Sequence, residues 1–200
     1  RCGDSRKRCV LLLQAGVSGE MDPRVTTPGR WVSLIGSAYD WAYRAEPESG
    51  LSGRVLQYPR GKALGGSSAI NAMAHIRGHR ASFDSWRALG NPGWGYDDVL
   101  PLFKRSERND AGGSTYRGGD GLLSVSHCAD AHDGHRAFLA AAAENGFGAE
   151  ARFDFNGPSP MDTAGFYQKN ILNGRRHSAA AAFLVPVLDR PNLEIRLGAV

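Results

Sequence analysis

The residues best suited to chemistry lie in the stretch PRGKALGGSSAIN, residues 59–71. Gly65 and Gly66 lack Cβ atoms, so the backbone there can adopt unusual dihedral angles and a ligand can approach it closely. Ser67 and Ser68 are good N-cap residues for a following helix, and the free N–H groups at the start of a helix attract anions. The stretch predicts a nucleotide-binding loop, with a glycine-rich turn before a packed helix as the alternative.

Histidines offer a second kind of chemistry. His75 and His79 are four residues apart, a spacing that binds metal ions on a helix, but a glycine lies between them and no third ligand is apparent. Cys128, His132 and His135 form another group, in which His135 falls in the first turn of an alanine-rich helix and is expected to be solvated. We therefore predict no metal site.

A strand must lead towards the glycine-rich stretch. Residues 10–14 (VLLLQ) are apolar on both faces, as in a buried parallel strand. In dinucleotide-binding folds an acidic residue at the end of the second strand holds the ribose hydroxyls. Gln14 occupies such a position with an amide but no charge. The signature G-x-G-x-x-G is absent, and the chain begins without Met, so we expect a fragment whose glycine motif precedes Arg1.

The remaining elements are predicted from periodicity and breakers. Residues 70–77 place apolar side chains at helical spacing, which predicts a short helix with one buried face. A glycine-rich crossing follows at residues 109–121, and Asn173-Gly174 predicts a turn. Other predicted elements are a helix over 81–89, helices capped by Asp97, Asp133 and Ser178, and strands over 122–127, 165–172 and 193–197. This order predicts an α/β or mixed architecture with a small second subdomain.

Composition narrows the class of protein. The hydrophobic fraction of 42% can form a substantial core. Most of the net charge of +4 comes from the basic residues among 1–9, so charge gives little support for a nucleic-acid partner. Three cysteines without a CxxC pair indicate a reducing compartment rather than a disulfide framework. No apolar run is long enough for a membrane span. These features favour a cytoplasmic protein, with peripheral attachment to a membrane as the alternative.

Several motifs together resemble one known family. PRGKALGGSSAINAM, the following RGH and the segment DSWRALGNPGWGYDDVLPLFKRSE are similar to the glucose–methanol–choline (GMC) family of flavin oxidoreductases. NGRRHSAAAAFLVPVLDRPNLEI resembles a later stretch of that family, and VLLLQAG resembles its second strand. The resemblance covers almost the whole chain in the correct order, and the choline dehydrogenase-like branch is the most similar.

The resemblance implies an α/β (α+β mixed) fold. An FAD/NAD(P)-binding Rossmann-like domain would be interleaved with an antiparallel-sheet substrate domain, both incomplete. Residues 1–110 would be part of the FAD-binding domain, without its first strand and glycine motif. Residues 121–173 would start the substrate domain, and residues 174–200 would return to the FAD-binding domain.

The resemblance also implies an activity. Members oxidise an alcohol CH–OH group to a carbonyl by passing hydride to flavin N5 while a base takes the hydroxyl proton. The expected partner is a small-molecule alcohol, with no nucleic acid and with the electron acceptor left open. The alternatives are an FAD-containing hydroxynitrile lyase and a truncated, non-catalytic fragment.

Site residues follow from the resemblance position by position. Leu64 to Ser68 match the loop against the flavin and its phosphates, and Asn71 begins the segment that passes the flavin ring. Ile70 stands where some members carry a histidine that links flavin covalently, so non-covalent FAD is expected. None of the six histidines matches the C-terminal catalytic pair, so the catalytic residues stay unassigned. The cofactor-binding residues implied are Gln14, Leu64, Gly65, Gly66, Ser67, Ser68, Asn71, Met73 and Ala74.

Overall fold

The chain forms two compact units built from short helices and strands. The structure, a computed structural model, describes residues 8–128, 131–158 and 162–199. The first unit contains Arg1–Met73 and Ile171–Val200, and the second contains Ala74–Asn170. The predicted mixed α and β fold is confirmed, and each sheet among the described residues has two strands. Cys2 and the other residues of the basic start, 1–7, lie outside the described residues, and Cys9 and Cys128 are exposed free thiols.

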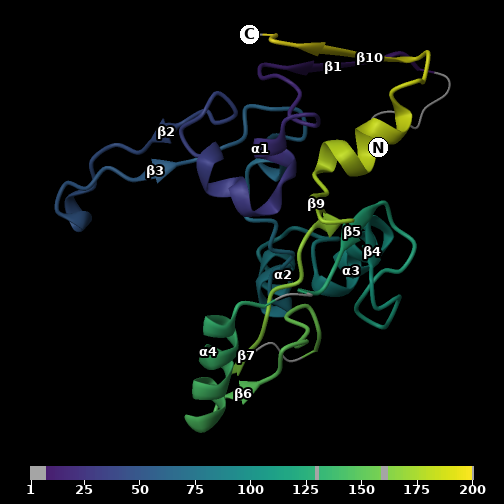
Figure 1. The fold of residues 1–200 in the computed structure, drawn as a ribbon. Coiled ribbons are helices and arrows are strands. Elements are labelled where there is room, and N and C mark those ends of the chain that lie inside the picture. Colours follow the sequence, from purple (N-terminus) through teal and green to yellow (C-terminus); the bar gives the residue numbers. More distant parts are fainter. Residues whose placement is uncertain (1–7, 129–130, 159–161, 200) are drawn as a thin grey trace. The chain divides into compact units, whose positions relative to one another are not determined.

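A parallel pair of strands joins the two ends of the described chain (Figure 1). Strand β1 (Val10–Gln14) pairs with β10 (Leu193–Leu197) in the register Val10 to Leu193 through Gln14 to Leu197. Both strands have the predicted bounds. The expectation of burial on both faces was wrong, because Leu11 and Leu13 are 51% and 62% exposed in a sheet that has no third strand among the described residues.

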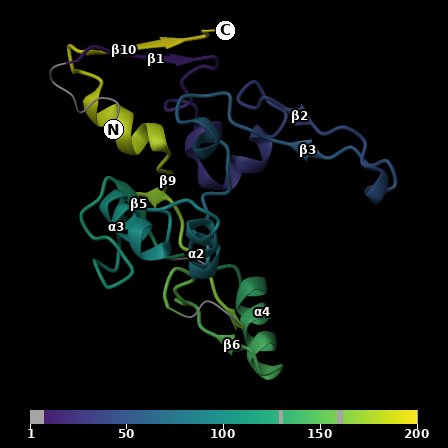
Figure 2. The ribbon, with the colours of Figure 1, turned by 180° about the vertical axis from the view of Figure 1, so that it is seen from behind.

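The first unit has a small core beside a hairpin. Strands β2 (Tyr43–Arg44) and β3 (Gln57–Tyr58) pair antiparallel and run side by side (Figure 2). Trp41 stacks on Tyr43 with ring centroids 5.7 Å apart. Short helices of this unit are α1 (Pro23–Thr26) and the 3-10 helices η1 (Pro28–Leu34) and η2 (Ser49–Leu51). The buried core consists of Val25, Leu34, Tyr39, Ala63, Ala69 and Ile70.

A second hairpin belongs to the same unit. Strand β8 (Ile171–Leu172) pairs antiparallel with β9 (Arg175–Arg176). The residues between them, Asn173 and Gly174, have φ values of 50° and 72°, the left-handed backbone that an Asn-Gly turn adopts in a hairpin. The predicted turn is thus confirmed. The π-helix η4 (Ala180–Leu184) and the 3-10 helix η5 (Val185–Val187) follow.

Helices α2 (Arg80–Ala88) and α3 (Tyr96–Ser106) form the core of the second unit, where Phe83, Tyr96 and Val99 are buried together. The cap predicted at Asp97 was wrong. Gly95 is the N-cap, because Asp98 lies three residues further and its carboxylate accepts a hydrogen bond from the Gly95 N–H at 3.1 Å.

The rest of the second unit is a long helix with two pairs of short strands. Helix α4 (Asp133–Glu144) begins after His132, whose Nδ1 accepts from the Gly134 N–H at 3.1 Å, so the predicted cap at Asp133 was one residue late. Gly146 follows α4 with a φ of 80°, as predicted for a C-terminal stop. The parallel pairs are β4 (Glu107–Asn109) with β5 (Leu123–Val125), and β6 (Gly148–Ala149) with β7 (Thr163–Ala164).

The helix predicted over residues 70–77 is absent. The 3-10 helix η3 (Gly66–Ala69) ends before Ile70, and the chain then continues as an irregular segment in which Met73 has a φ of 61°. In the second unit the His75 N–H donates to the Gln168 carbonyl at 2.8 Å, and Ala74 bridges to Lys169. This long-range pairing takes the place of the helix that the local spacing predicts. The single strand predicted over 165–172 was also wrong, because the structure has an isolated bridge at Lys169 and only the short strand β8 at the end of that range.

The boundaries between the two units fall at Met73 and Asn170. The resemblance places the corresponding divisions at residues 110 and 173, and the assignment of cofactor and substrate roles to these parts stays a prediction. No helix in the described ranges is long and apolar enough to cross a membrane.

Candidate functional site

The glycine loop, residues 64–73, lies after the end of β1. Leu64 is buried, and its N–H donates to the Val17 carbonyl at 3.1 Å. Gly65 and Gly66 have φ values of 89° and 58°, a backbone conformation that residues with a side chain rarely adopt. A Cβ on Gly65 would lie 3.0 Å from Ala180 N, whereas a Cβ on Gly66 would meet no atom within 4 Å. Gly65 therefore faces packed protein, and Gly66 offers an open stretch of backbone to a ligand.

The two serines of the glycine loop do not cap a helix. The Ser68 Oγ donates to the Gly65 carbonyl at 2.6 Å and accepts from the Ala179 N–H at 2.8 Å. The Ser67 Oγ accepts from the Gly61 N–H at 3.1 Å. Because η3 has only four residues and no side-chain cap, the anion site predicted at a helix N-terminus is not formed. The serines instead fix the shape of the loop.

Asn71 and Met73 form the exit of the glycine loop. The Asn71 Oδ1 accepts from the Met73 N–H at 3.0 Å, which closes a short turn. Met73 has a φ of 61° and is 3% exposed. The next residue, Ala74, is exposed and begins the second unit.

Arg176 holds the glycine loop from strand β9. Its Nε donates to the Val25 carbonyl at 2.8 Å. Its Nη1 donates to the backbone carbonyls of Ser68 and Asn71 at 3.0 and 2.7 Å. Burial lowers the pKa of Arg176 to about 10, so the guanidinium still carries its charge at neutral pH.

The residues that follow Arg176 also contact the first unit's earlier segments, Ser68 among them. We call residues 176–181 the clamp segment. The Ser178 Oγ donates to Glu20 Oε1 at 2.8 Å and accepts from the Ala181 N–H at 3.0 Å, which supports its predicted role at a helix start. Sequence reasoning gave the clamp segment no part in the site. The Asn-Gly turn could have indicated the buried arginine, because side chains alternate along the strand after the turn and leave Arg175 exposed and Arg176 buried.

Gln14 connects strand β1 to the glycine loop. Its Nε2 donates to the Ala63 carbonyl at 2.8 Å, and its Oε1 accepts from the Gly16 N–H at 3.0 Å. Gly16 itself is packed so closely that a Cβ would overlap the Lys62 carbonyl. The structure thus brings Gln14 together with the loop, while the contact of Gln14 with a ribose stays a prediction.

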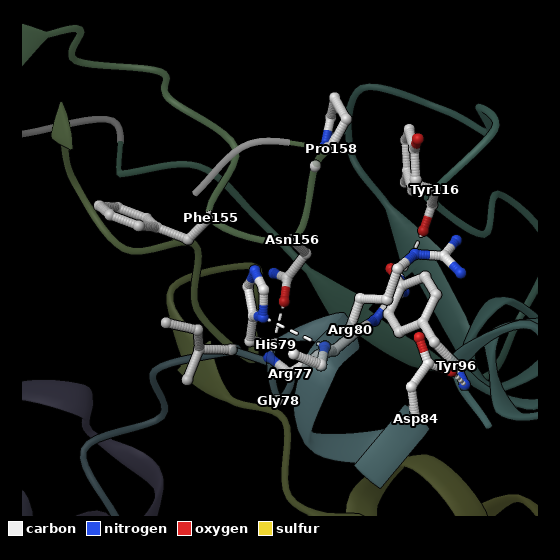
Figure 3. A pocket seen from close by; sticks show the side chains of 13 residues that line it. Arg77, Gly78, His79, Arg80, Asp84, Tyr96, Tyr116, Phe155, Asn156 and Pro158 are labelled. Carbon is white, nitrogen blue, oxygen red and sulfur yellow. Dashed lines mark hydrogen bonds between the residues drawn. The ribbon is translucent and has the colours of Figure 1, made fainter. Parts of the chain in front are cut away.

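A cavity of about 420 Å³ lies within the second unit (Figure 3). The Asn156 Oδ1 accepts from the Arg77 N–H at 2.6 Å, and its Nδ2 donates to the His75 carbonyl at 3.0 Å. Arg80 lies 4.4 Å from the centre of the Tyr96 ring. The volume falls in the range of small-molecule sites. The lining residues are Ile76, Arg77, Gly78, His79, Arg80, Ala81, Asp84, Tyr96, Tyr116, Phe155, Asn156, Gly157 and Pro158.

A buried charge cluster supports one side of this cavity. Glu107 is fully buried and accepts hydrogen bonds from Arg77, Arg117 and Asn109. Burial alone would raise the pKa of Glu107, but the adjacent His75 ring, the two guanidinium charges and the Asn109 amide together lower it to about 2. The carboxylate is therefore ionised at neutral pH.

The histidines considered as metal ligands have structural contacts. His75 Nδ1 lies 3.2 Å from Asn170 Nδ2, and His79 Nδ1 accepts from the Ala81 N–H at 3.1 Å. In the described part of the chain, no group of three or more His, Cys, Asp or Glu side chains is arranged to hold a metal ion.

The comparison with protein families decides the class. The sequence profile described as GMC oxidoreductase matches residues 10–200. The chain belongs to the GMC oxidoreductase family. This confirms the resemblance on which the sequence reasoning relied, and it places the chain among FAD-binding flavoproteins.

Curated members of the GMC oxidoreductase family are similar to the chain along its length. The mitochondrial choline dehydrogenase of Mus musculus is 41% identical over 191 residues, which are 92% of this chain and 32% of that protein. The oxygen-dependent choline dehydrogenase of Rhizobium etli (strain CIAT 652) is 40% identical over 200 residues, which are 99% of this chain and 36% of that protein. The chain therefore spans about a third of the length of these relatives.

A solved GMC oxidoreductase structure shares the fold. Pyridoxine 4-oxidase from Mesorbium loti matches with a TM-score of 0.87 and 35% identity, covering 98% of this chain and 38% of that protein. These relatives are dehydrogenases and an oxidase, and they give no support to the hydroxynitrile lyase alternative.

The glycine loop of this GMC oxidoreductase fits a bound FAD. Gly66 leaves its backbone open, and Asn71 is exposed with its oxygen already occupied by protein donors. Ser67 and Ser68 follow Gly66 directly. Gln14 donates to the Ala63 carbonyl, Gly65 faces Ala180, and Leu64 and Met73 are buried. Their contacts with FAD remain predictions.

Proposed function

We propose that the protein carrying this chain oxidises the CH–OH group of a small alcohol to a carbonyl, with non-covalent FAD as the oxidant. The observation that carries the proposal is the glycine loop, which is open at Gly66 and fixed at Ser68 and Asn71 by the clamp segment. Bound flavin would supply the hydride acceptor for the alcohol carbon.

The residues of this chain have binding and orienting roles in the proposal. Gly66 allows the backbone to approach the cofactor, and Asn71 donates a hydrogen bond to it. Gln14 contacts the ribose or fixes the strand end beside it. We assign the proton-accepting base to no residue of this chain, since none of its six histidines matches the C-terminal catalytic pair that the family resemblance implies.

The substrate class follows from the relatives. Their names specify choline and pyridoxine, both of which carry a hydroxyl group. We propose a small, hydroxyl-bearing substrate of this size. A cytoplasmic location, with peripheral attachment to a membrane as the alternative, also belongs to the proposal.

The test uses the complete polypeptide that contains residues 1–200, purified and supplied with FAD. The expected result is a flavin absorption spectrum that survives gel filtration, is released by denaturation, and is bleached anaerobically by choline or another alcohol from a panel. Oxygen and a redox dye, offered separately, identify the electron acceptor. A folded polypeptide that retains no flavin after FAD addition would overturn the proposal. Flavin that stays attached after denaturation would overturn the non-covalent part.

A further inference from the structure

The side-chain amide of Asn71 is held with a defined polarity. Its Oδ1 accepts from the Met73 N–H at 3.0 Å and from Arg176 Nη1 at 2.9 Å. A backbone N–H and a guanidinium are donors only, so the atom that faces both of them must be the oxygen. The Nδ2 group therefore points elsewhere as a donor, and it has no acceptor among the described residues.

Arg176 imposes this polarity from a buried position. The residue is 5% exposed, and three of its four hydrogen bonds go to the backbone carbonyls of Val25, Ser68 and Asn71. The guanidinium is a planar fork with fixed donor directions, so its seat on these carbonyls also fixes the direction of its bond to the Asn71 Oδ1.

Packing alone does not require an arginine at this position. Burial of a cation is costly unless it is paired. The charge of Glu20 acts favourably on Arg176, but no carboxylate of the described residues forms a salt bridge with it, and burial remains the larger effect. An apolar side chain could fill the same volume at lower cost. The arginine supplies donors to the glycine loop, which an apolar residue cannot do.

We propose that Arg176 is a positioning residue that presents the Asn71 Nδ2 donor to a hydrogen-bond acceptor of the flavin ring system, either a carbonyl oxygen or an unprotonated ring nitrogen. The inference rests on the proposed function, in which the glycine loop binds FAD. It also specifies the edge of the flavin ring that faces Asn71. That edge carries an acceptor, because a flavin N–H would face the Nδ2 donor and form no hydrogen bond with it. Without Arg176, only the Met73 N–H holds the amide in this orientation, and the outward direction of the Nδ2 donor is less firmly fixed.

The sharpest test is Asn71→Asp in the complete polypeptide. An Asp carboxylate still accepts from Met73 and Arg176, and it adds an ion pair to Arg176, so the melting temperature of the FAD-free protein should be unchanged or higher. The outward donor becomes an acceptor with negative charge. We expect FAD to bind at least tenfold more weakly, measured by quenching of flavin fluorescence, with a shift of the visible absorption bands of the flavin that stays bound.

Substitutions of the two arginines test the positioning role. Arg176→Met keeps an unbranched side chain, although a shorter one, and removes its donors, so FAD affinity should fall at least tenfold, and Arg176→Lys should restore part of it. Arg175→Met is the matched control, since Arg175 is the exposed neighbour on the same strand and should leave FAD affinity unchanged.

The outcomes separate the two proposals. Failure of the unsubstituted protein to bind FAD overturns the proposed function. If that protein binds FAD and Asn71→Asp binds it with the same affinity and spectrum, the inference is overturned while the proposed function stands. Equal affinities of Arg176→Met and Arg175→Met for FAD would likewise remove the role of Arg176. If Arg176→Met does not fold, Asn71→Asp alone decides.

Discussion

Arg117 Nε donates to Glu107 Oε1 at 2.6 Å, and the Glu107 side chain has no exposed surface. Arg77 donates to the other carboxylate oxygen, and Arg117 Nη1 also donates to the partly exposed Asp154 at 2.9 Å, so Glu107 is the fully buried anion shared by two buried cations. Removal of one member of such a cluster leaves buried charge uncompensated, which is far more damaging than loss of a surface ion pair.

We predict that Glu107→Gln lowers the free energy of unfolding by about 3–5 kcal/mol, because both guanidinium groups lose their shared buried counter-charge and only Arg117 keeps a second carboxylate, that of Asp154. The measurement is denaturant unfolding of the complete polypeptide. Asp97→Asn is the control, since Asp97 also accepts two arginine hydrogen bonds, both from Arg80, but is exposed. It should cause little change. Equal losses in the two variants would show that burial of the cluster does not matter.

The same carboxylate predicts a pH dependence. The pKa of Glu107 is about 2 in the folded protein, whereas the ordinary pKa of a glutamate, which we take for the unfolded chain, is 4.5. A lowered pKa stabilises the folded state above pH 4.5, and that contribution is lost as the pH falls towards 2. The loss should amount to about 3 kcal/mol. Between pH 5 and 2, the free energy of unfolding should therefore fall more steeply with decreasing pH for the unsubstituted protein than for Glu107→Gln. An equal fall in both proteins would contradict the assignment.

Gly66 and Gly36 give a matched pair for the cofactor face. Both have positive φ values, 58° and 71°, and neither has an atom within 4 Å of a built Cβ. Alanine at either position should destabilise the fold by a similar amount, about 1–2 kcal/mol. Only Gly66→Ala places a methyl group on the proposed FAD face, so only that variant should weaken FAD binding, by at least tenfold. A comparable loss of FAD affinity in Gly36→Ala would refute this distinction.

Gly16 should tolerate no side chain. A Cβ there would overlap the Lys62 carbonyl, and that backbone belongs to the approach of β1 to the glycine loop. We expect Gly16→Ala to lower the free energy of unfolding by about 1–3 kcal/mol or to prevent folding. Gly29→Ala, which meets no atom within 4 Å, should be neutral or slightly stabilising. A melting temperature of Gly16→Ala equal to that of the unsubstituted protein would show that the contact can relax.

Local patterns predicted the elements that local forces determine. Strands β1 and β10, helix α2 and the turn at Asn173 agree with apolar runs, breakers and turn residues that lie within each segment. The helix expected over 70–77 failed because that segment pairs with Gln168 and Lys169. No local pattern contains a partner so distant in the chain.

The candidate site shows the same division. The glycine loop was recognisable from its residues and from the family resemblance. Arg176 was not, because its contacts reach Ser68, Asn71 and Val25, which are 105 to 151 positions away. Its burial and its four acceptors become apparent only when the folded chain is known.

The distance between the glycine loop and the clamp segment has a consequence for biosynthesis. Arg176 follows Asn71 by 105 residues, so a ribosome that adds about 5–20 residues per second completes the loop roughly 5 to 20 s before it supplies the arginine. Strand β1 waits still longer for β10. The nascent chain therefore emerges with apolar strand faces uncovered and with its cofactor loop unformed. From this order we expect chaperones to meet the uncovered apolar strands during translation, and the proposed FAD site to form only after the clamp segment has left the ribosome.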